Sequence, residues 1–528
     1  MPPSTPAARA ASWAGRPGLW TTRSVKGGAP PYNRRFAMDQ ETLADHLRRA
    51  TRNFTSRLPE ERVFTLGQAL AVELARAHGE QPPRHPDLDL DAIPMADGAP
   101  HLTGGSAAGE TTEDLFRLGC LLNALALGTP ADPSWRLDGP PAAEVSTVRR
   151  RAVLSTLAAP RRTDRYATAE EAARELLAAT AAAPAVPAWP LFRGDTARTG
   201  ARPAASAARM RPGWRVASGP VVASPILTAD LVVVPATDGR LLFIDRTRGR
   251  VLHTVAIGPS ECSPTLVDGV LHAGTDEGLL LGIDVATGAE RYRAKLGGLV
   301  RSSPLPITNG VVVGIVDAKG AGAVVAVDGK GKTIWTRKLG AVFSSAALAA
   351  GRVLCGSDDG FLHALDAATG AVVWSAKLGA KVRASPTVGS ETAIVGAFDG
   401  RVAAVRIADG TEAWSTAIGH AVYSSACLAG EVAVFGCHEG HLHGLDVRTG
   451  APRFETPTRG PVVSSPVAAG AFVIGASTDG SLYLLDESGR VLDRQPLAAG
   501  GIQSSPALDG LDLAIGSAEG VHVLRLEA

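Results

Sequence analysis

A seven-residue stretch, CHEGHLH at 437–443, carries the side chains best suited to metal chemistry. Thiolate sulfur and imidazole nitrogen are ligands that Zn²⁺ prefers. Alternate residues of a β-strand lie on one face, so His441 and His443 would share a face, with Cys437 and His438 close by. This spacing makes His438 and His441 candidate zinc ligands.

The stretch belongs to a repeat that must position it. A serine flanked by Ala, Ser or Cys and by Pro or Ala recurs at intervals of 39 to 42 residues. A fixed period near 40, with four short strand signals in each unit, is typical of the blades of a β-propeller. We call these residues the marker serines; they are Ser224, Ser263, Ser303, Ser345, Ser385, Ser425, Ser465 and Ser505.

The repeat also gives the histidines ordinary structural roles. His443 takes the place of His363 and Tyr483, at a position that packs between strands. His438 takes the place of Phe398, in a turn whose sequence varies. The repeat therefore favours exposed His438 and His441 and a packed His443, and we expect no bound metal.

Each unit reads as four antiparallel strands. An inner strand follows the marker serine, and a glycine turn such as GSDDG (356–360) leads to an apolar strand such as LHALD (362–366). Asp-Gly pairs permit the positive φ values of a tight hairpin. The fourth strand carries an aromatic residue, which we expect to join neighbouring blades. This position holds Tyr292, Trp335, Trp374, Trp414 and Phe454, with His253 and Asp493 as exceptions.

Eight marker serines predict eight blades, although the last repeat stops before its fourth strand. The segment GWRVASG (213–219) supplies a spare fourth strand just before the first marker. Pairing it with the last blade closes the ring and leaves no open sheet edge. The fold class is therefore mainly β, an eight-bladed propeller of four-stranded blades over 189–528.

Three further segments precede the propeller. Residues 39–180 show the apolar periodicity of helices, and 181–188 form an Ala/Pro linker. Residues 1–38 carry six Arg and Lys residues, no acidic residue and no continuous apolar stretch. We expect a disordered basic tail there, or sequence upstream of a true start at Met38.

Over 189–528 the repeat resembles the PQQ-like (pyrroloquinoline quinone) β-propeller family, and WPLFRGDTARTG (189–200) resembles the segment that introduces such propellers. The family contains quinoprotein dehydrogenases and cofactor-free scaffolds similar to an outer-membrane assembly lipoprotein. The resemblance implies that a dehydrogenase would need a tryptophan floor, bound Ca²⁺ and adjacent cysteines. The chain has no Cys-Cys pair, and its repeats have no insertions that could form a substrate pocket. We expect no cofactor, with a quinone-dependent dehydrogenase as the alternative.

The helical segment resembles the C-lobe of a Ser/Thr protein kinase, through HPDLDLDAI (85–93), EDLFRLGCLLNALALGTPA (113–131) and TDRYATAEEA (163–172). The resemblance places Asp87 at the catalytic base. It also places Ala92 and Thr103 where the Mg²⁺ ligands would be, so phosphoryl transfer is not expected. Asp87 is then vestigial, and the lobe is a docking element or a regulator of a true protein kinase in trans.

Composition and charge limit the classes of partner that the protein could bind. The net charge of +1 gives no basic field for nucleic acid or an anionic membrane, and no apolar run is long enough for a membrane span. Five cysteines without CxxC spacing fit a reducing compartment, which predicts a cytoplasmic protein. We expect a non-catalytic scaffold or adaptor that binds another protein.

The partner site is predicted from a position two residues before each marker serine, which varies while its surroundings repeat. All eight such residues begin inner strands, so symmetry places them at one mouth of the central channel. Arginine and aromatic residues are frequent interface anchors. We expect Arg301 and Arg383 to flank Phe343 and grip an acidic group; alternatively, rim charges such as Glu261 and Arg301 pair with each other. This mouth ring consists of Val222, Glu261, Arg301, Phe343, Arg383, Tyr423, Val463 and Gln503.

Overall fold

The computed structural model describes residues 189–203 and 208–527, together with single helical positions at 71, 153, 156, 157, 172 and 176. The tail over 1–38, Asp87 and the kinase-like arrangement predicted for 39–180 lie outside the described residues. Within the described part of the chain, no helix is long and apolar enough to cross a membrane.

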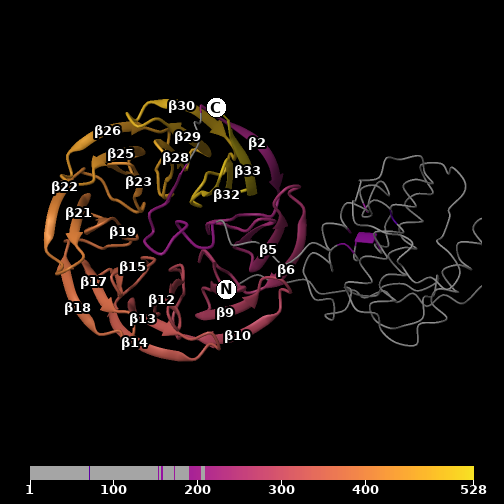
Figure 1. The fold of residues 1–528 in the computed structure, drawn as a ribbon, viewed down its shortest axis with the longest axis horizontal. Helices are drawn as coiled ribbons and strands as arrows, with labels where there is room; N and C mark the ends of the chain where they lie inside the picture. The colour runs from indigo at the N-terminus through magenta and orange to yellow at the C-terminus, as the bar shows by residue number, and fades with distance from the viewer. Residues whose placement is uncertain are drawn as a thin grey trace, which may run out of the picture.

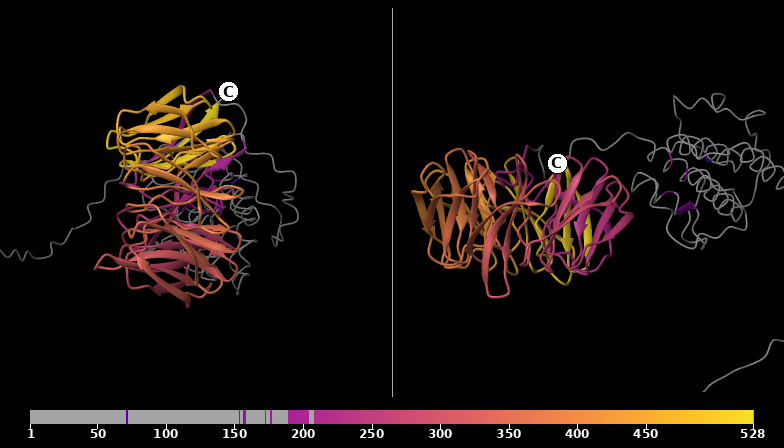
Figure 2. Two further views of the ribbon diagram at one scale, coloured as in Figure 1. Left: turned by 90° about the vertical axis from the view of Figure 1, so that its left-hand side faces the viewer. Right: turned by 90° about the horizontal axis from the view of Figure 1, so that it is seen from below.

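The propeller consists of eight sheets arranged around a central channel, which confirms the predicted number of blades (Figure 1). Seen from the side, the blades form a flat ring (Figure 2). In each blade the strand nearest the channel is the shortest or equal shortest, and the strands lengthen toward the rim.

The strands of the first four blades follow one another from the channel outward. Blade one contains β3 (Ile226–Leu227), β4 (Leu231–Pro235), β5 (Arg240–Asp245) and β6 (Val251–Ala256). Blade two contains β7 (Thr265–Val267), β8 (Val270–Gly274), β9 (Leu279–Asp284) and β10 (Glu290–Lys295). Blade three contains β11 (Leu305–Ile307), β12 (Gly310–Val316), β13 (Ala321–Val327) and β14 (Thr333–Gly340). Blade four contains β15 (Ala347–Ala349), β16 (Arg352–Gly356), β17 (Phe361–Asp366) and β18 (Val372–Lys377).

The remaining blades have the same order. Blade five contains β19 (Thr387–Val388), β20 (Thr392–Gly396), β21 (Arg401–Arg406) and β22 (Glu412–Ala417). Blade six contains β23 (Cys427–Ala429), β24 (Val432–Gly436), β25 (His441–Asp446) and β26 (Pro452–Pro457). Blade seven contains β27 (Val467–Ala469), β28 (Phe472–Ala476), β29 (Ser481–Leu485) and β30 (Val491–Pro496). Blade eight contains β31 (Ala507–Asp509), β32 (Asp512–Ser517), β33 (Gly520–Glu527) and β2 (Arg209–Val216).

Burial follows the position of each strand in its blade. The second and third strands lie between neighbouring blades, so β4 is buried along its whole length and reads LVVVP. The outermost strands face solvent on one side, and β18 alternates between exposed and buried residues with Trp374 facing inward. This difference explains the sequence pattern: the second and third strands are continuous apolar runs, and the outermost strands mix apolar and polar residues.

The turns follow the predicted chemistry. Between β16 and β17, Gly360 has a φ of +87°, and a side chain there would lie 2.4 Å from the carbonyl oxygen of Gly379. After β17, Asp366 accepts the hydroxyl and backbone N–H groups of Thr369, and these bonds lower the pKa of its carboxyl group. The Asp-Gly and Thr-Gly signals therefore mark turns that only these residue types satisfy well.

Neighbouring blades are joined by the predicted aromatic residues. The indole of Trp335 packs on Gly370 of the next blade, where a Cβ atom would lie only 2.4 Å from the ring, and its Nε1–H donates to Ala367 O at 3.1 Å. Trp374, Trp414 and Trp214 repeat this arrangement at Gly410, Gly450 and Gly249. Asp493, the polar exception, instead accepts the backbone N–H of Met210 at 2.7 Å. The tryptophans of the outer strands thus bind blade to blade.

The ring closes as predicted, because β2 pairs antiparallel with β33 in the order β2-β33-β32-β31. The strand runs from Arg209 to Val216, whereas the sequence indicated 213–219. Pro212 lies inside it, which an outermost strand tolerates because one side of that strand needs no backbone donors. β33 extends to Glu527 and gives Arg209 a partner.

Candidate functional site at the two mouths of the channel

The marker serines surround the channel in a chain of hydrogen bonds. The hydroxyl oxygen of every marker serine except Ser303 accepts the backbone N–H of the marker serine one blade earlier. Seven such bonds, 2.8 to 3.0 Å long, are present among the described residues, including one from Ser505 N–H to Ser224 Oγ across the closure of the ring. The marker serines therefore link neighbouring blades around the channel.

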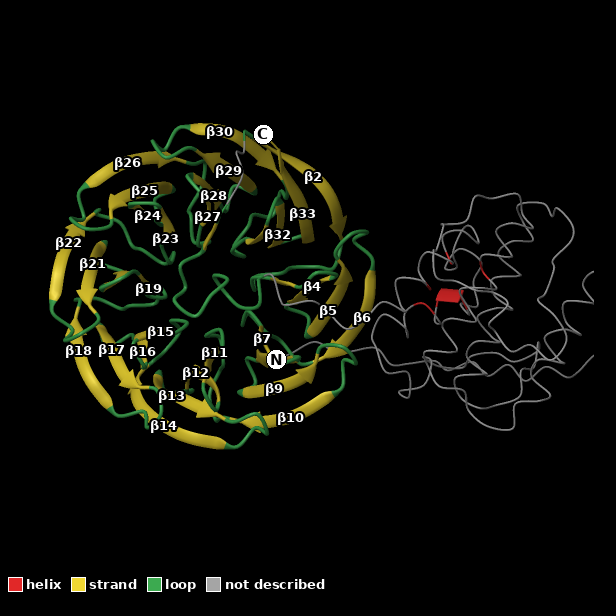
Figure 3. Cartoon of the chain, viewed as in Figure 1, coloured by secondary structure: helices red, strands yellow, loops and turns green. Residues whose placement is uncertain are grey.

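One mouth of the channel is covered by residues 189–202, which we call the lead-in segment. It crosses the middle of the ring as a loop ending in β1 (Ala201–Arg202), parallel to β27 (Figure 3). Its backbone carbonyls accept N–H groups from the inner strands of six blades, beginning with Leu227 of blade one, which donates to Trp189 O at 3.0 Å. The other five donors are Leu266, Leu348, Val388, Leu428 and Ala468.

Two buried arginines anchor the lead-in segment. Arg198 is fully buried; its Nε donates to Ala346 O at 2.9 Å and its Nη2 to Ser303 O and Pro304 O at 3.3 and 3.1 Å. Arg193 is 2% exposed and donates to the carbonyl oxygens of Pro466 and Ala426. The two guanidinium groups thus hold backbone carbonyls of four different blades.

The buried arginines remain charged at neutral pH. Burial lowers the pKa of Arg193 to about 10 and that of Arg198 to about 9, and the nearby Asp195 carboxylate opposes the shift. Buried charges are stable only when they are paired or fully hydrogen-bonded. Backbone carbonyl oxygens accept from both guanidinium groups, although the Nε of Arg193 has no partner among the described residues. The protein's own chain thus occupies this mouth.

The mouth ring lies at the opposite mouth. The lead-in segment bonds to residues three positions after the marker serines, whereas the ring residues stand two positions before them. All eight ring residues are half-buried or exposed, and Tyr423 is 37% exposed. We call this side of the propeller the ring face and the other side the lead-in face.

The arginines of the mouth ring already have carboxylate partners. Arg301 binds Asp276 through two hydrogen bonds of 2.8 and 2.9 Å and Glu261 at 2.8 Å. Arg383 binds Asp358 through two bonds of 2.9 and 2.7 Å. The geometry therefore favours the alternative in which rim charges pair with one another.

Aromatic rings line the same mouth over blades four to six. The guanidinium of Arg383 lies 4.2 Å from the centre of the Phe343 ring and 5.2 Å from that of Phe398. Phe398 contacts Tyr423 at 4.1 Å between ring centres, and Tyr423 contacts His438 at 5.5 Å. We call these five residues, Phe343, Arg383, Phe398, Tyr423 and His438, the aromatic arc.

Sequence reasoning missed Phe398 as a member of this surface. Its turn position faces the ring mouth because its N–H donates to Lys381 O, just before the inner strand, and His438 N–H donates likewise to Ala421 O. The sequence did contain a signal for it, because the turn position held by Phe398 and His438 varies between blades, as do the residues of the mouth ring. Gln503 is exposed at the mouth, and the contacts described for the arc do not include it.

The structure changes the set of candidate metal ligands. His441 lies close to His443 and Cys437, with one potential ligand atom of each within 4.8 Å of the others. His438 is not in this group and contacts Tyr423 instead. The repeat was right that His443 is packed, since it is 7% exposed.

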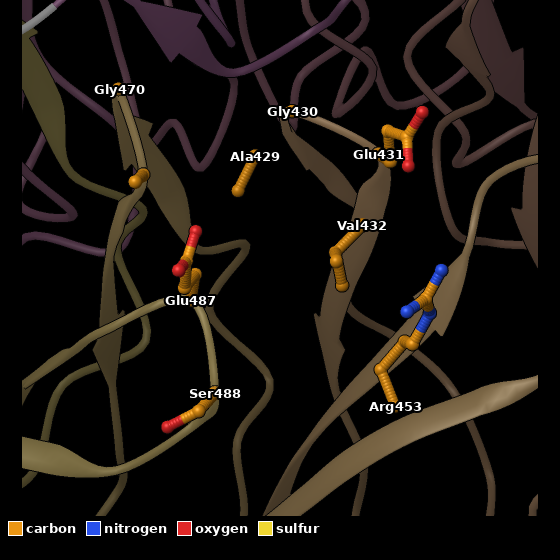
Figure 4. A pocket seen from close by; sticks show the side chains of 9 residues that line it. Ala429, Gly430, Glu431, Val432, Arg453, Gly470, Glu487 and Ser488 are labelled. Carbon is orange, nitrogen blue, oxygen red and sulfur yellow. The ribbon is translucent and has the colours of Figure 1, made fainter.

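A cleft of about 670 Å³ opens on the lead-in face between blades six and seven (Figure 4). Glu431 and Arg453 line it from blade six, and Glu487 and Ser488 from blade seven. The polar side chains of its described lining are two glutamates, an arginine and a serine, and none belongs to the mouth ring. The cleft therefore offers a control surface for tests of the ring face.

Comparison with known proteins supports the propeller assignment. The family profile described as outer membrane protein assembly factor BamB matches residues 193–296 and 320–520. Among curated proteins, none matches the sequence closely enough to support an inference.

Solved structures show the same fold at low sequence identity. BamB from Moraxella catarrhalis is 20% identical, with a TM-score of 0.52, 60% of this chain covered and 100% of that one. The quinohemoprotein alcohol dehydrogenase ADHIIG from Pseudomonas putida is 13% identical, with a TM-score of 0.55 and coverages of 64% and 80%. A europium-containing methanol dehydrogenase is 12% identical, with a TM-score of 0.55 and coverages of 64% and 98%. These similarities establish the fold alone.

Proposed function

Because the chain belongs to the family of the outer membrane protein assembly factor BamB, we propose that its propeller is a non-catalytic module that binds another protein at the mouth ring. The observation that supports this proposal is the aromatic arc, which presents partly exposed rings at the mouth that the lead-in segment leaves open. Flat aromatic and arginine surfaces of this kind are typical of interface anchors.

The arc is held in place before any partner arrives. Asp358 fixes the guanidinium of Arg383 with two hydrogen bonds, and Phe343 and Phe398 both contact it. Tyr423 is in turn held against Phe398. Little side-chain freedom remains to be lost on binding, so more of the contact energy appears as affinity.

The charges at the mouth bear on the chemistry of the partner. Arg301 faces Glu261 and Asp276, while Arg383 and Lys381 face Asp358. These three cations and three carboxylates cancel. An acidic partner would compete with intramolecular carboxylates, whereas an uncharged extended segment with an apolar or aromatic side chain would stack on the arc without breaking ion pairs.

Two features support a non-catalytic role over the dehydrogenase alternative. Trp214, Trp335, Trp374 and Trp414 pack between blades instead of forming a floor for a planar cofactor. Arg193 and Arg198 occupy the middle of the ring at the mouth that the lead-in segment covers, where their donors bind the backbone. The residues present therefore do not fit a quinone bound there.

The test uses the full chain to select binders from a displayed library of random peptides. We expect the selected peptides to be rich in uncharged apolar and aromatic residues. The substitution Tyr423→Ala should weaken their binding by about thirtyfold, as truncation of a central interface aromatic does. Its melting temperature should stay within about 2 °C of the parent, because the side chain is partly exposed.

Glu487→Ala in the cleft on the lead-in face is the matched control and should leave peptide binding unchanged. Peptides whose affinity survives Tyr423→Ala but falls in Glu487→Ala would place the site on the lead-in face. Alcohol-dependent dye reduction after addition of pyrroloquinoline quinone and Ca²⁺ would contradict a non-catalytic role.

A further inference from the structure

Blade six holds a compact group of thiol and imidazole side chains on the ring face. Cys437 follows β24, and His441 and His443 lie two residues apart at the start of β25. One potential ligand atom of each lies within 4.8 Å of the others. Ligand atoms around tetrahedral Zn²⁺ are separated by about 3.5 Å, so a small side-chain adjustment would bring the group to coordinating distance.

Two imidazole nitrogens in this group are buried without a hydrogen-bond partner among the described residues, Nδ1 of His441 and Nε2 of His443. The side chain of His443 is 7% exposed and Cys437 is fully buried. Buried polar atoms in folded proteins nearly always have a partner, and a bound ion is one of the explanations for an exception. We propose that Cys437, His441 and His443 bind a zinc ion.

Blade four provides an internal comparison. His363 occupies the position of His443, and both of its nitrogens are satisfied: Nδ1 contacts Ser375 Oγ at 2.8 Å and Nε2 contacts Asp359 at 3.1 Å. Ser357 there occupies the position of Cys437. A histidine that only packs at this position therefore has ordinary hydrogen-bond partners for both of its ring nitrogens.

Blade six departs from that pattern at several positions together. The serine becomes Cys437, the first residue of the third strand becomes His441, and Ser375 is replaced by Glu455. Glu439, in the place of Asp359, lies 3.6 Å from His420 instead of bonding His443. The changes remove the hydrogen-bond partners and add ligands, which is the combination that a metal site requires.

The second nitrogen of His441 faces a carboxylate. Glu455 pairs directly with His443 across β25 and β26, and its Oε1 lies 3.7 Å from His441 Nε2, the nitrogen opposite the unpartnered Nδ1. A carboxylate at that nitrogen orients a ligating histidine, and a water molecule can complete the tetrahedron around three protein ligands. Thiolate and imidazole together favour Zn²⁺ over Mg²⁺ and Ca²⁺, which prefer oxygen ligands.

The site would also support the aromatic arc. Cys437 immediately precedes His438, and both lie in the turn between β24 and β25. A metal bond at Cys437 would hold this turn and so the end of the arc that contacts Tyr423. The zinc site stands on its own observations and does not depend on the proposed peptide binding.

The test treats the full chain with a chelator and then adds Zn²⁺ or Co²⁺ alone. We expect one equivalent to bind, with the thiolate-to-cobalt absorption band of a cysteine ligand. Cys437→Ser should abolish that band and weaken Zn²⁺ binding at least tenfold. The variant should fold, because serine is the residue that blades four and seven carry at this position, as Ser357 and Ser477.

His438→Gln is the matched control, since His438 is adjacent in sequence but outside the group. It should keep both the stoichiometry and the absorption band. Added Zn²⁺ should raise the melting temperature of the parent and of His438→Gln but not of Cys437→Ser. Equal Zn²⁺ affinity in Cys437→Ser and the parent, or no stoichiometric binding by the parent, would overturn the proposal.

Discussion

Replacing Arg198 with methionine will lower the free energy of unfolding by about 3 to 5 kcal/mol. The substitution keeps most of the side-chain volume but removes the donors to Ala346, Ser303 and Pro304, and their carbonyl groups stay buried. A buried acceptor that loses its donor suffers the full cost of desolvation. Equilibrium urea unfolding of the full chain measures the change.

The matched control is Arg211→Met. Arg211 is on β2, its side chain is 73% exposed, and its ion pair with Glu527 is also exposed. Exposed pairs contribute about 0 to 1 kcal/mol, so this variant should resemble the parent. A change below about 1 kcal/mol in Arg198→Met would show that the lead-in segment is not anchored as described.

A chain that begins at residue 219 will melt at least about 10 °C below one that begins at 189 and will associate through blade eight. The shorter chain lacks the lead-in segment and β2, so β33 becomes an open edge and Trp214 no longer packs on Gly249. Differential scanning calorimetry and light scattering measure the two effects.

A peptide spanning 205–219 separates the two contributions. Added in excess to the shorter chain, it should restore the monomer by pairing with β33, while the melting temperature recovers only in part because Arg193 and Arg198 are still missing. If the shorter chain stays monomeric and has the same melting temperature as the longer chain, closure by β2 is excluded as a source of stability.

The repeat was sufficient to predict the blades because, apart from the bond between Ser505 and Ser224 that closes the ring, the marker serines and the Asp-Gly turns act within about 40 residues. The role of the lead-in segment could not be predicted in the same way. Arg193 reaches Pro466, 273 residues away, and Arg198 reaches Ala346, 148 residues away. No local spacing encodes such contacts, and only the closed ring brings their acceptors to the channel.

The candidate sites were partly predictable for similar reasons. Symmetry placed the mouth ring, but the bonds from Arg301 to Asp276 and from Arg383 to Asp358 depend on turn geometry that the pattern does not contain. For Cys437, His441 and His443, the alternation of side chains along a strand was the better guide, because even spacing places residues on one face. Cys437 N–H donates to His441 O across the turn, so Cys437 shares the face of His441, and His438 does not.

The lead-in segment is synthesised long before most of the blades that it contacts. Arg193 leaves the ribosome 273 residues before Pro466, which supplies one of its carbonyl acceptors. At typical synthesis speeds that interval lasts roughly 15 to 50 s. During that time the nascent blades accumulate as an open arc, and the segment that will cap their inner strands has nothing complete to cap. The earliest part of the propeller to be synthesised is thus among the last to acquire its final contacts.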